Sequence, residues 1–177
     1  MQDRTQEGKE STIYQYQLIR RIRHSLFFTG LYPALLVTYI FYSILTHGWN
    51  NIIWLGISAG SVLLVHSIGI YLLCWRNGER LRGCWKFQFQ LPRFGWVPAT
   101  SYTRLDRFRH MFVQLFWLGL FLFAALSPWA AHHAAMHGVV LHLWVLLPQL
   151  TLLLRCLRQP GSYLIRFGIR ETSIYKQ

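Results

Sequence analysis

Histidine is the side chain whose number and spacing in this sequence most favour chemistry. The chain carries eight histidines, and five of them gather near two short interruptions of long apolar stretches: His47, His132, His133, His137 and His142. His133 and His137 are four residues apart, so a helix would place both imidazoles on one face as metal ligands. Imidazole suits zinc, copper and haem iron. Histidine is also ordinary at a membrane interface, so a metal site and a plain interfacial role both stay open.

A further histidine, His66, lies deep inside an apolar stretch. Counting from Ile52 places it about 21 Å from the outer membrane boundary, whereas the same count places His142 only about 6–7 Å from it. Two ligands of one haem need similar depths on facing helices, so this difference of about 14 Å speaks against a haem held by the pair. We therefore expect His66 to hydrogen-bond to a neighbouring helix through one of three intramembrane polar residues, namely Gln114, Gln149 or Thr151.

The pattern Gly56-Ile57-Ser58-Ala59-Gly60 resembles the G-x-S-x-G motif of hydrolases. That motif works where a strand-to-helix turn exposes the serine, whereas here it lies in an apolar helical run. Gly56 and Gly60 instead predict close helix packing. The six carboxylates all lie outside the apolar stretches, which argues against proton-coupled transport by this chain alone. We identify no catalytic residue, and these features favour a non-enzymatic protein without deciding the matter.

The histidines belong to two long stretches without Asp, Glu, Lys or Arg. Interruptions divide these stretches into four spans of about 25–46, 52–75, 111–131 and 138–154. A helix of roughly 20 residues covers the ~30 Å hydrocarbon core, and lipid cannot satisfy backbone amides in any open conformation. The expected fold class is an all-α integral membrane protein, with a four-helix transmembrane bundle over residues 25–154.

Basic residues give the expected orientation. All 18 Lys and Arg lie before the first span, between the second and third, or after the fourth, and the net charge is +12. The positive-inside rule then makes both termini cytoplasmic, in a multi-pass protein of the plasma (inner) membrane. Anionic lipid headgroups are the expected partners of the cations nearest the spans: Arg20, Arg21, Arg23, Arg76, Arg80, Arg82, Lys86, Arg107 and Arg109. No nucleic-acid module fits the segment 76–110, so no nucleic acid is expected as a partner.

The segments outside the spans contain structure signals of their own. The amphipathic segment 1–24 suits an interfacial helix or a strand. Residues 85–91 in the loop 76–110, and residues 163–169 in the basic tail 155–177, alternate with period two, which predicts a small cytoplasmic β element. Aromatic residues of the headgroup belt are the alternative interpretation. Thr103 and Asp106 resemble a capping box that begins the third helix.

Three functions fit these features. The first is a non-enzymatic subunit or scaffold of a larger membrane assembly, with other membrane subunits or a second copy as partners. The second is a protein that binds zinc, copper or haem through the outer histidines. The third is an oligomeric channel or transporter that depends on His66 or Gln114.

Overall fold

The computed structural model describes residues 17–23, 26–78, 85–89, 94–99, 102–129, 132–168 and 171–176. In these ranges the elements follow the order β1, α1, α2, β2, β3, β4, α4, α5, β5 and β6. The chain is mostly helical, and short strands come before and after each pair of consecutive helices in the sequence.

The helices are α1 (Leu26–His47), α2 (Asn51–Arg76), α4 (Leu105–Leu126) and α5 (His132–Arg155). All four are long and apolar enough to cross a membrane, which confirms the predicted number of spans and fits a multi-pass membrane protein. Three boundaries differ from the prediction by more than one residue. Helix α4 ends at Leu126 and not near 131, shortly before Pro128. Helix α4 begins at Leu105 because its charged first turns remain helical, and α5 begins at His132 because residues 132–137 contain no Pro or Gly.

The start of α4 is held by the backbone of the C-terminal tail. The Leu105 amide donates to the Tyr163 carbonyl at 2.8 Å, and the Asp106 amide donates to the Gly161 carbonyl at 3.0 Å. These bonds satisfy two amides that a helix N-terminus leaves without partners inside the helix. The helix begins one residue later than a capping box at Thr103 requires: Thr103 belongs to strand β4 and pairs with Ile165, and Arg104, in the N-cap position, makes no side-chain capping hydrogen bond.

A four-stranded antiparallel sheet joins the N-terminal segment to the tail. Its order is β1 (Gln17–Arg23), β6 (Glu171–Lys176), β5 (Leu164–Phe167) and β4 (Thr103–Arg104). Ile165 and Ile174 are fully buried on the face that packs against the helix core. The alternation in the tail is therefore a strand pattern, as predicted, and an all-α description is too narrow.

A separate two-stranded hairpin follows α2. Strand β2 (Trp85–Gln88) pairs antiparallel with β3 (Gly95–Pro98), and Phe87 lies opposite Trp96. The predicted strand beginning at Trp85 is thus confirmed, although it joins the hairpin and not the larger sheet.

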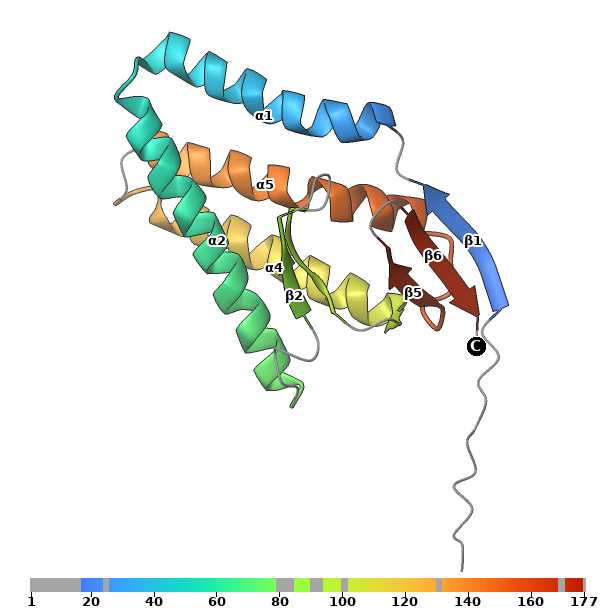
Figure 1. Ribbon diagram of the computed structural model, residues 1–177. Helices are drawn as coiled ribbons and strands as arrows, with labels where there is room; N and C mark the ends of the chain where they lie inside the picture. The colour runs from blue at the N-terminus through green and yellow to red at the C-terminus, as the bar shows by residue number, and fades with distance from the viewer. Residues whose placement is uncertain are drawn as a thin grey trace, which may run out of the picture.

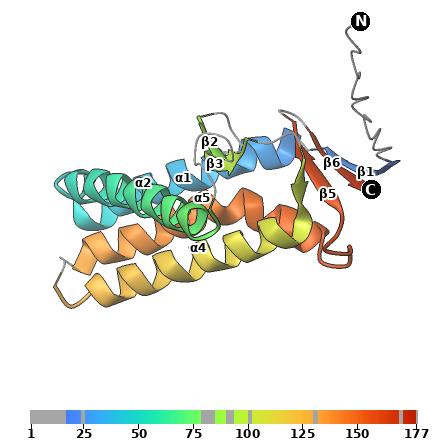
Figure 2. The same ribbon diagram turned by 90° about the horizontal axis from the view of Figure 1, so that it is seen from below.

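Figure 1 shows the bundle with two distinct ends. The α1–α2 and α4–α5 connections lie together at one end, which we call the loop end, and the sheet lies at the opposite end, which we call the sheet end. Helices α4 and α5 run side by side, while α2 crosses them obliquely and diverges from them toward its C-terminus. Figure 2, turned by 90°, shows the same sheet at one end of the helices. The hairpin lies between α2 and the sheet, over α5 (Figure 1).

Glycine packing inside the bundle does not fall on the predicted pair. A Cβ added at Gly56 or Gly60 would meet no atom within 4 Å, because this side of α2 faces outward. The close approaches are at Gly69, Gly119 and Gly138, where an added Cβ would meet side chains of α4 or α5 at 3.0 Å or less.

Candidate functional site

Five histidines of the four long helices form two groups. His66 of α2 and His142 of α5 meet inside the bundle, whereas His47, His133 and His137 line a pocket at the loop end. The sequence analysis grouped His142 with the outer histidines. The structure places it with His66 instead. His132 begins α5, and its side chain lies outside the described residues.

The inner pair is directly hydrogen-bonded. His66 Nε2 and His142 Nδ1 lie 2.8 Å apart, and His142 Nε2 lies 3.1 Å from the Phe116 carbonyl oxygen. A carbonyl only accepts, so the hydrogen of His142 sits on Nε2, and its Nδ1 accepts from His66 Nε2–H. Both side chains are buried. The two bonds thus link α2, α5 and α4 at one point and assign each ring a tautomer.

The predicted difference in depth between these histidines was wrong. Because α5 begins at His132, His142 lies about 15 Å along its helix and not 6–7 Å. The oblique course of α2 (Figure 1) also makes a residue count along it exceed the true depth. The two nitrogens lie closer together than two ligands of one iron, which would be about 4 Å apart, twice a ~2.0 Å metal–nitrogen bond.

None of the three predicted partners bonds to His66, and two of them are engaged elsewhere. Gln114 Oε1 accepts from Arg76 Nη2 at 3.1 Å, and Thr151 Oγ1 donates to the Pro148 carbonyl at 2.9 Å. Gln149 Oε1 is buried and has no hydrogen-bond partner in the described part of the chain. It lines a small internal cavity of about 20 Å³ beside Trp85 and Trp96.

Gly119 provides the space for the inner pair. A Cβ added at this position would overlap the imidazole of His142. The sequence gives no periodic or motif signal for this contact, because Gly119 stands alone in an apolar helix.

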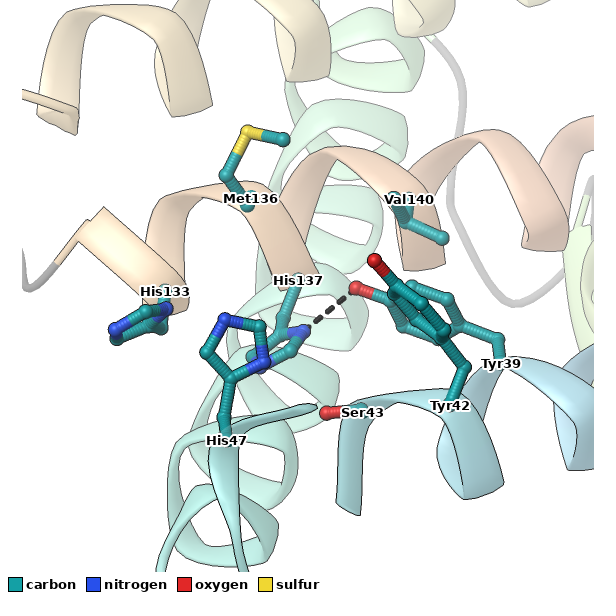
Figure 3. A pocket seen from close by; sticks show the side chains of 8 residues that line it. All are labelled: Tyr39, Tyr42, Ser43, His47, His133, Met136, His137 and Val140. Carbon is teal, nitrogen blue, oxygen red and sulfur yellow. Dashed lines mark hydrogen bonds between the residues drawn. The ribbon is translucent and has the colours of Figure 1, made fainter. Parts of the chain in front are cut away.

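The loop-end pocket lies between α1 and α5 (Figure 3) and has a volume of about 230 Å³. The Tyr39 hydroxyl and His137 Nδ1 lie 2.6 Å apart inside it. The rings of His47 and His133 pack edge to face, with centroids 4.4 Å apart. Tyrosine, serine, methionine and valine side chains complete the lining: Tyr39, Tyr42, Ser43, Met136 and Val140.

The outer ligand set is not assembled around a single point. No three His, Cys, Asp or Glu side chains of the described residues are placed to hold a metal ion together. Three of the five predicted histidines still line one pocket, so the metal site remains a prediction for His47, His133 and His137.

The predicted headgroup contacts lie away from the loop end. Arg20 and Arg21 lie on β1, Arg76 ends α2, Lys86 lies on β2, and Arg107 and Arg109 belong to the first turns of α4. Arg80, Arg82 and the side chain of Arg23 lie outside the described residues. Arg21 lies 4.0 Å from the carboxylate of Glu171, and both of these side chains are partly exposed.

The hairpin makes the contacts that sequence reasoning missed. Trp96 Nε1 donates to Ser67 Oγ at 3.0 Å, and a Cβ added at Gly95 would lie 3.3 Å from Val145. Phe94 packs against Trp144, with ring centroids 6.2 Å apart. These partners lie near the middle of α2 and α5, so a segment expected in the cytoplasm packs against helices that are long and apolar enough to cross a membrane.

Trp144 extends these contacts to α1. Its ring stacks on Tyr32 with centroids 4.3 Å apart, and its Nε1 donates to the Tyr32 carbonyl at 3.0 Å. Helix α1 is the least buried of the four helices, so this aromatic contact is a principal link between it and α5.

Comparison with known proteins gives no relative, since the chain matches no protein-family model, no curated protein and no solved structure.

Proposed function

We propose that this chain is a non-enzymatic subunit of a larger membrane assembly. In the plasma (inner) membrane it would cross four times, with the sheet end and both termini on the cytoplasmic side. The position of the β2–β3 hairpin carries this proposal.

The hairpin reaches a depth at which lipid would surround a single copy of the chain. Ser67 lies nine residues before the end of α2, and Val145 lies ten residues before the end of α5. At 1.5 Å per residue these positions are about 14–15 Å along the helices, close to half of a ~30 Å hydrocarbon core.

Hydrocarbon tolerates such a hairpin only when protein or water covers it. Within the described residues β2 pairs only with β3, so its outer edge presents backbone N–H and C=O groups without partners. Each polar group left unsatisfied in lipid costs several kcal/mol. The Phe89 side chain is 76% exposed and Lys86 is also exposed, so this chain alone leaves the outer strand uncovered.

A protein partner would cover the exposed edge of β2 most directly. A transmembrane segment placed over β2 would exclude lipid from its edge and bury Phe89 together with the neighbouring ring of Phe87, whose centroid lies 4.8 Å away. The cations at the sheet end support the proposed orientation, because they would face cytoplasmic anionic headgroups at about 1 kcal/mol each.

Purification in a mild detergent, with identification of every co-purifying protein, tests the proposal. We expect a partner in constant ratio to the chain, and we expect Phe89→Lys to reduce its recovery. Trp129→Lys is the matched control, since Trp129 is 83% exposed at the loop end, away from the hairpin. A stable monomer with no partner in several mild detergents would overturn the proposal and would indicate a hydrated hairpin edge.

A further inference from the structure

We propose that His47, His133 and His137 form a binding site for a divalent metal ion of the zinc and copper type at the loop end of the bundle. This site is separate from the hairpin and does not depend on the proposed partner. Four observations support it: the hydrogen bonds of His47, those of His137, the position of His133, and the chemistry of the pocket wall.

His47 is held with a free nitrogen. Thr46 Oγ1 donates its hydrogen to the Tyr42 carbonyl at 2.9 Å, so it acts as the acceptor toward His47 Nδ1 at 2.7 Å. The hydrogen of neutral His47 therefore sits on Nδ1, and its Nε2 carries a lone pair. Metal-binding histidines typically donate the second ring N–H to a neighbour in this way, which orients the ring.

His137 has the same arrangement on the opposite helix. Its Nδ1 lies 2.6 Å from the Tyr39 hydroxyl, and its Nε2 is buried without a hydrogen-bond partner in the described part of the chain. The residue is only 4% exposed. A buried ring nitrogen without a partner is costly, and a metal ion would satisfy it once Nδ1–H donates to Tyr39.

His133 supplies the third imidazole. It lies one helical turn before His137 on α5 and packs against the ring of His47 from α1 (Figure 3). The three rings do not yet surround one point. His133 is exposed, so its ring can turn toward His137 within nanoseconds by a change of rotamer, while His47 keeps its bond to Thr46.

The pocket wall selects the class of ion. Three imidazoles without a carboxylate suit zinc or copper and disfavour magnesium and calcium, which prefer oxygen ligands. A site with three histidines leaves a fourth position for water or an exogenous ligand. The pocket of about 230 Å³ has room for it.

The experiment is a competitive Zn²⁺ titration of the chain, prepared without a polyhistidine tag and reconstituted in detergent, with Mg²⁺ as the comparison ion. We expect one Zn²⁺ per chain and no comparable Mg²⁺ binding. His47→Gln and His133→Gln should weaken Zn²⁺ binding by about 100-fold or more. Tyr39→Phe, which keeps all three imidazoles, should weaken it by about 10–100-fold through loss of the bond to His137.

His110→Gln is the matched control, because His110 is exposed near the start of α4 and far from the pocket in sequence and structure. Thermal unfolding of each variant separates loss of ligands from loss of fold, and exposed His47 and His133 should leave the melting temperature unchanged. Stoichiometric Zn²⁺ binding that is equal in His110→Gln, His47→Gln and His133→Gln would overturn the proposal, as would the absence of Zn²⁺ binding by the unaltered chain.

Discussion

His66 of α2 and His142 of α5 share a hydrogen bond of 2.8 Å in the interior of the bundle. His142 also donates to the Phe116 carbonyl of α4, so a single side chain connects three helices. Interhelical hydrogen bonds are worth about 0.6–1.7 kcal/mol in membrane proteins, and this pair has no competing water contact because both residues are buried. The pair therefore links α2, α5 and α4 at one buried point.

Gly119→Ala should destabilise the fold, because the added Cβ would overlap the His142 ring. We expect a loss of about 1–3 kcal/mol, the usual effect of overpacking a core. Gly60→Ala is the control, since a Cβ at that position meets nothing within 4 Å. Thermal unfolding in detergent compares the two variants. Equal melting temperatures would show that His142 does not occupy the space beside Gly119.

A double-mutant cycle with His66→Leu and His142→Leu should give a coupling energy of about 0.6–1.7 kcal/mol. The reason is that either single change leaves the remaining imidazole without its partner. The free energy of unfolding of the single and double variants provides the measurement. His66→Leu combined with His110→Gln serves as the uncoupled reference, and additive effects in the first cycle would contradict the observed bond.

Cysteines placed at Arg21 and Ser173 should form a disulfide on oxidation, in a chain whose natural cysteines are alanine. These positions face each other across β1 and β6. Directly opposed residues have Cα atoms about 4.5–5.5 Å apart, within the range of a disulfide. The pair 21 and 175 is the control, because diagonal positions lie about 7–8 Å apart. Faster closure of the control pair, followed by gel mobility, would mean a different register.

The Cys156 thiol should resist alkylation in the folded chain. Burial raises its pKa, and the nearby cations Arg20 and Arg109 offset this only in part, so little thiolate exists at pH 8. The side chain is also inaccessible at 0% exposure. In a variant with Cys74 and Cys84 replaced by serine, iodoacetamide at pH 8 should label the denatured chain much faster than the folded one. Comparable rates would place Cys156 at the surface.

The spans were predictable because charge and apolarity alone decide which segments can enter a membrane. The strands at residues 85–88 and 164–167 were predictable from their alternation. The first residues of the helices were harder to predict. The start of α4, for example, is held by the carbonyls of Gly161 and Tyr163, which lie far away in sequence. The same limit applies to His66 and His142, whose meeting depends on the inclination of α2.

The hairpin's location was the least predictable feature. Its cations, together with Pro92 and Gly95, indicate a loop between two spans. Its aromatic residues fit equally well in a headgroup layer. What places it against the helices is a set of tertiary contacts, such as Trp96 with Ser67 and Phe94 with Trp144. A one-dimensional pattern carries no information about them.

A photo-reactive amino acid at position 89, activated in native membranes, tests the subunit proposal most directly. Phe89 lies beside the open edge of β2, so we expect a discrete crosslink to one membrane protein. The same amino acid at Leu122, an exposed residue of α4, should give no such product. Lipid adducts alone at position 89, or the same protein adducts at both positions, would contradict the claim that a partner subunit covers the hairpin.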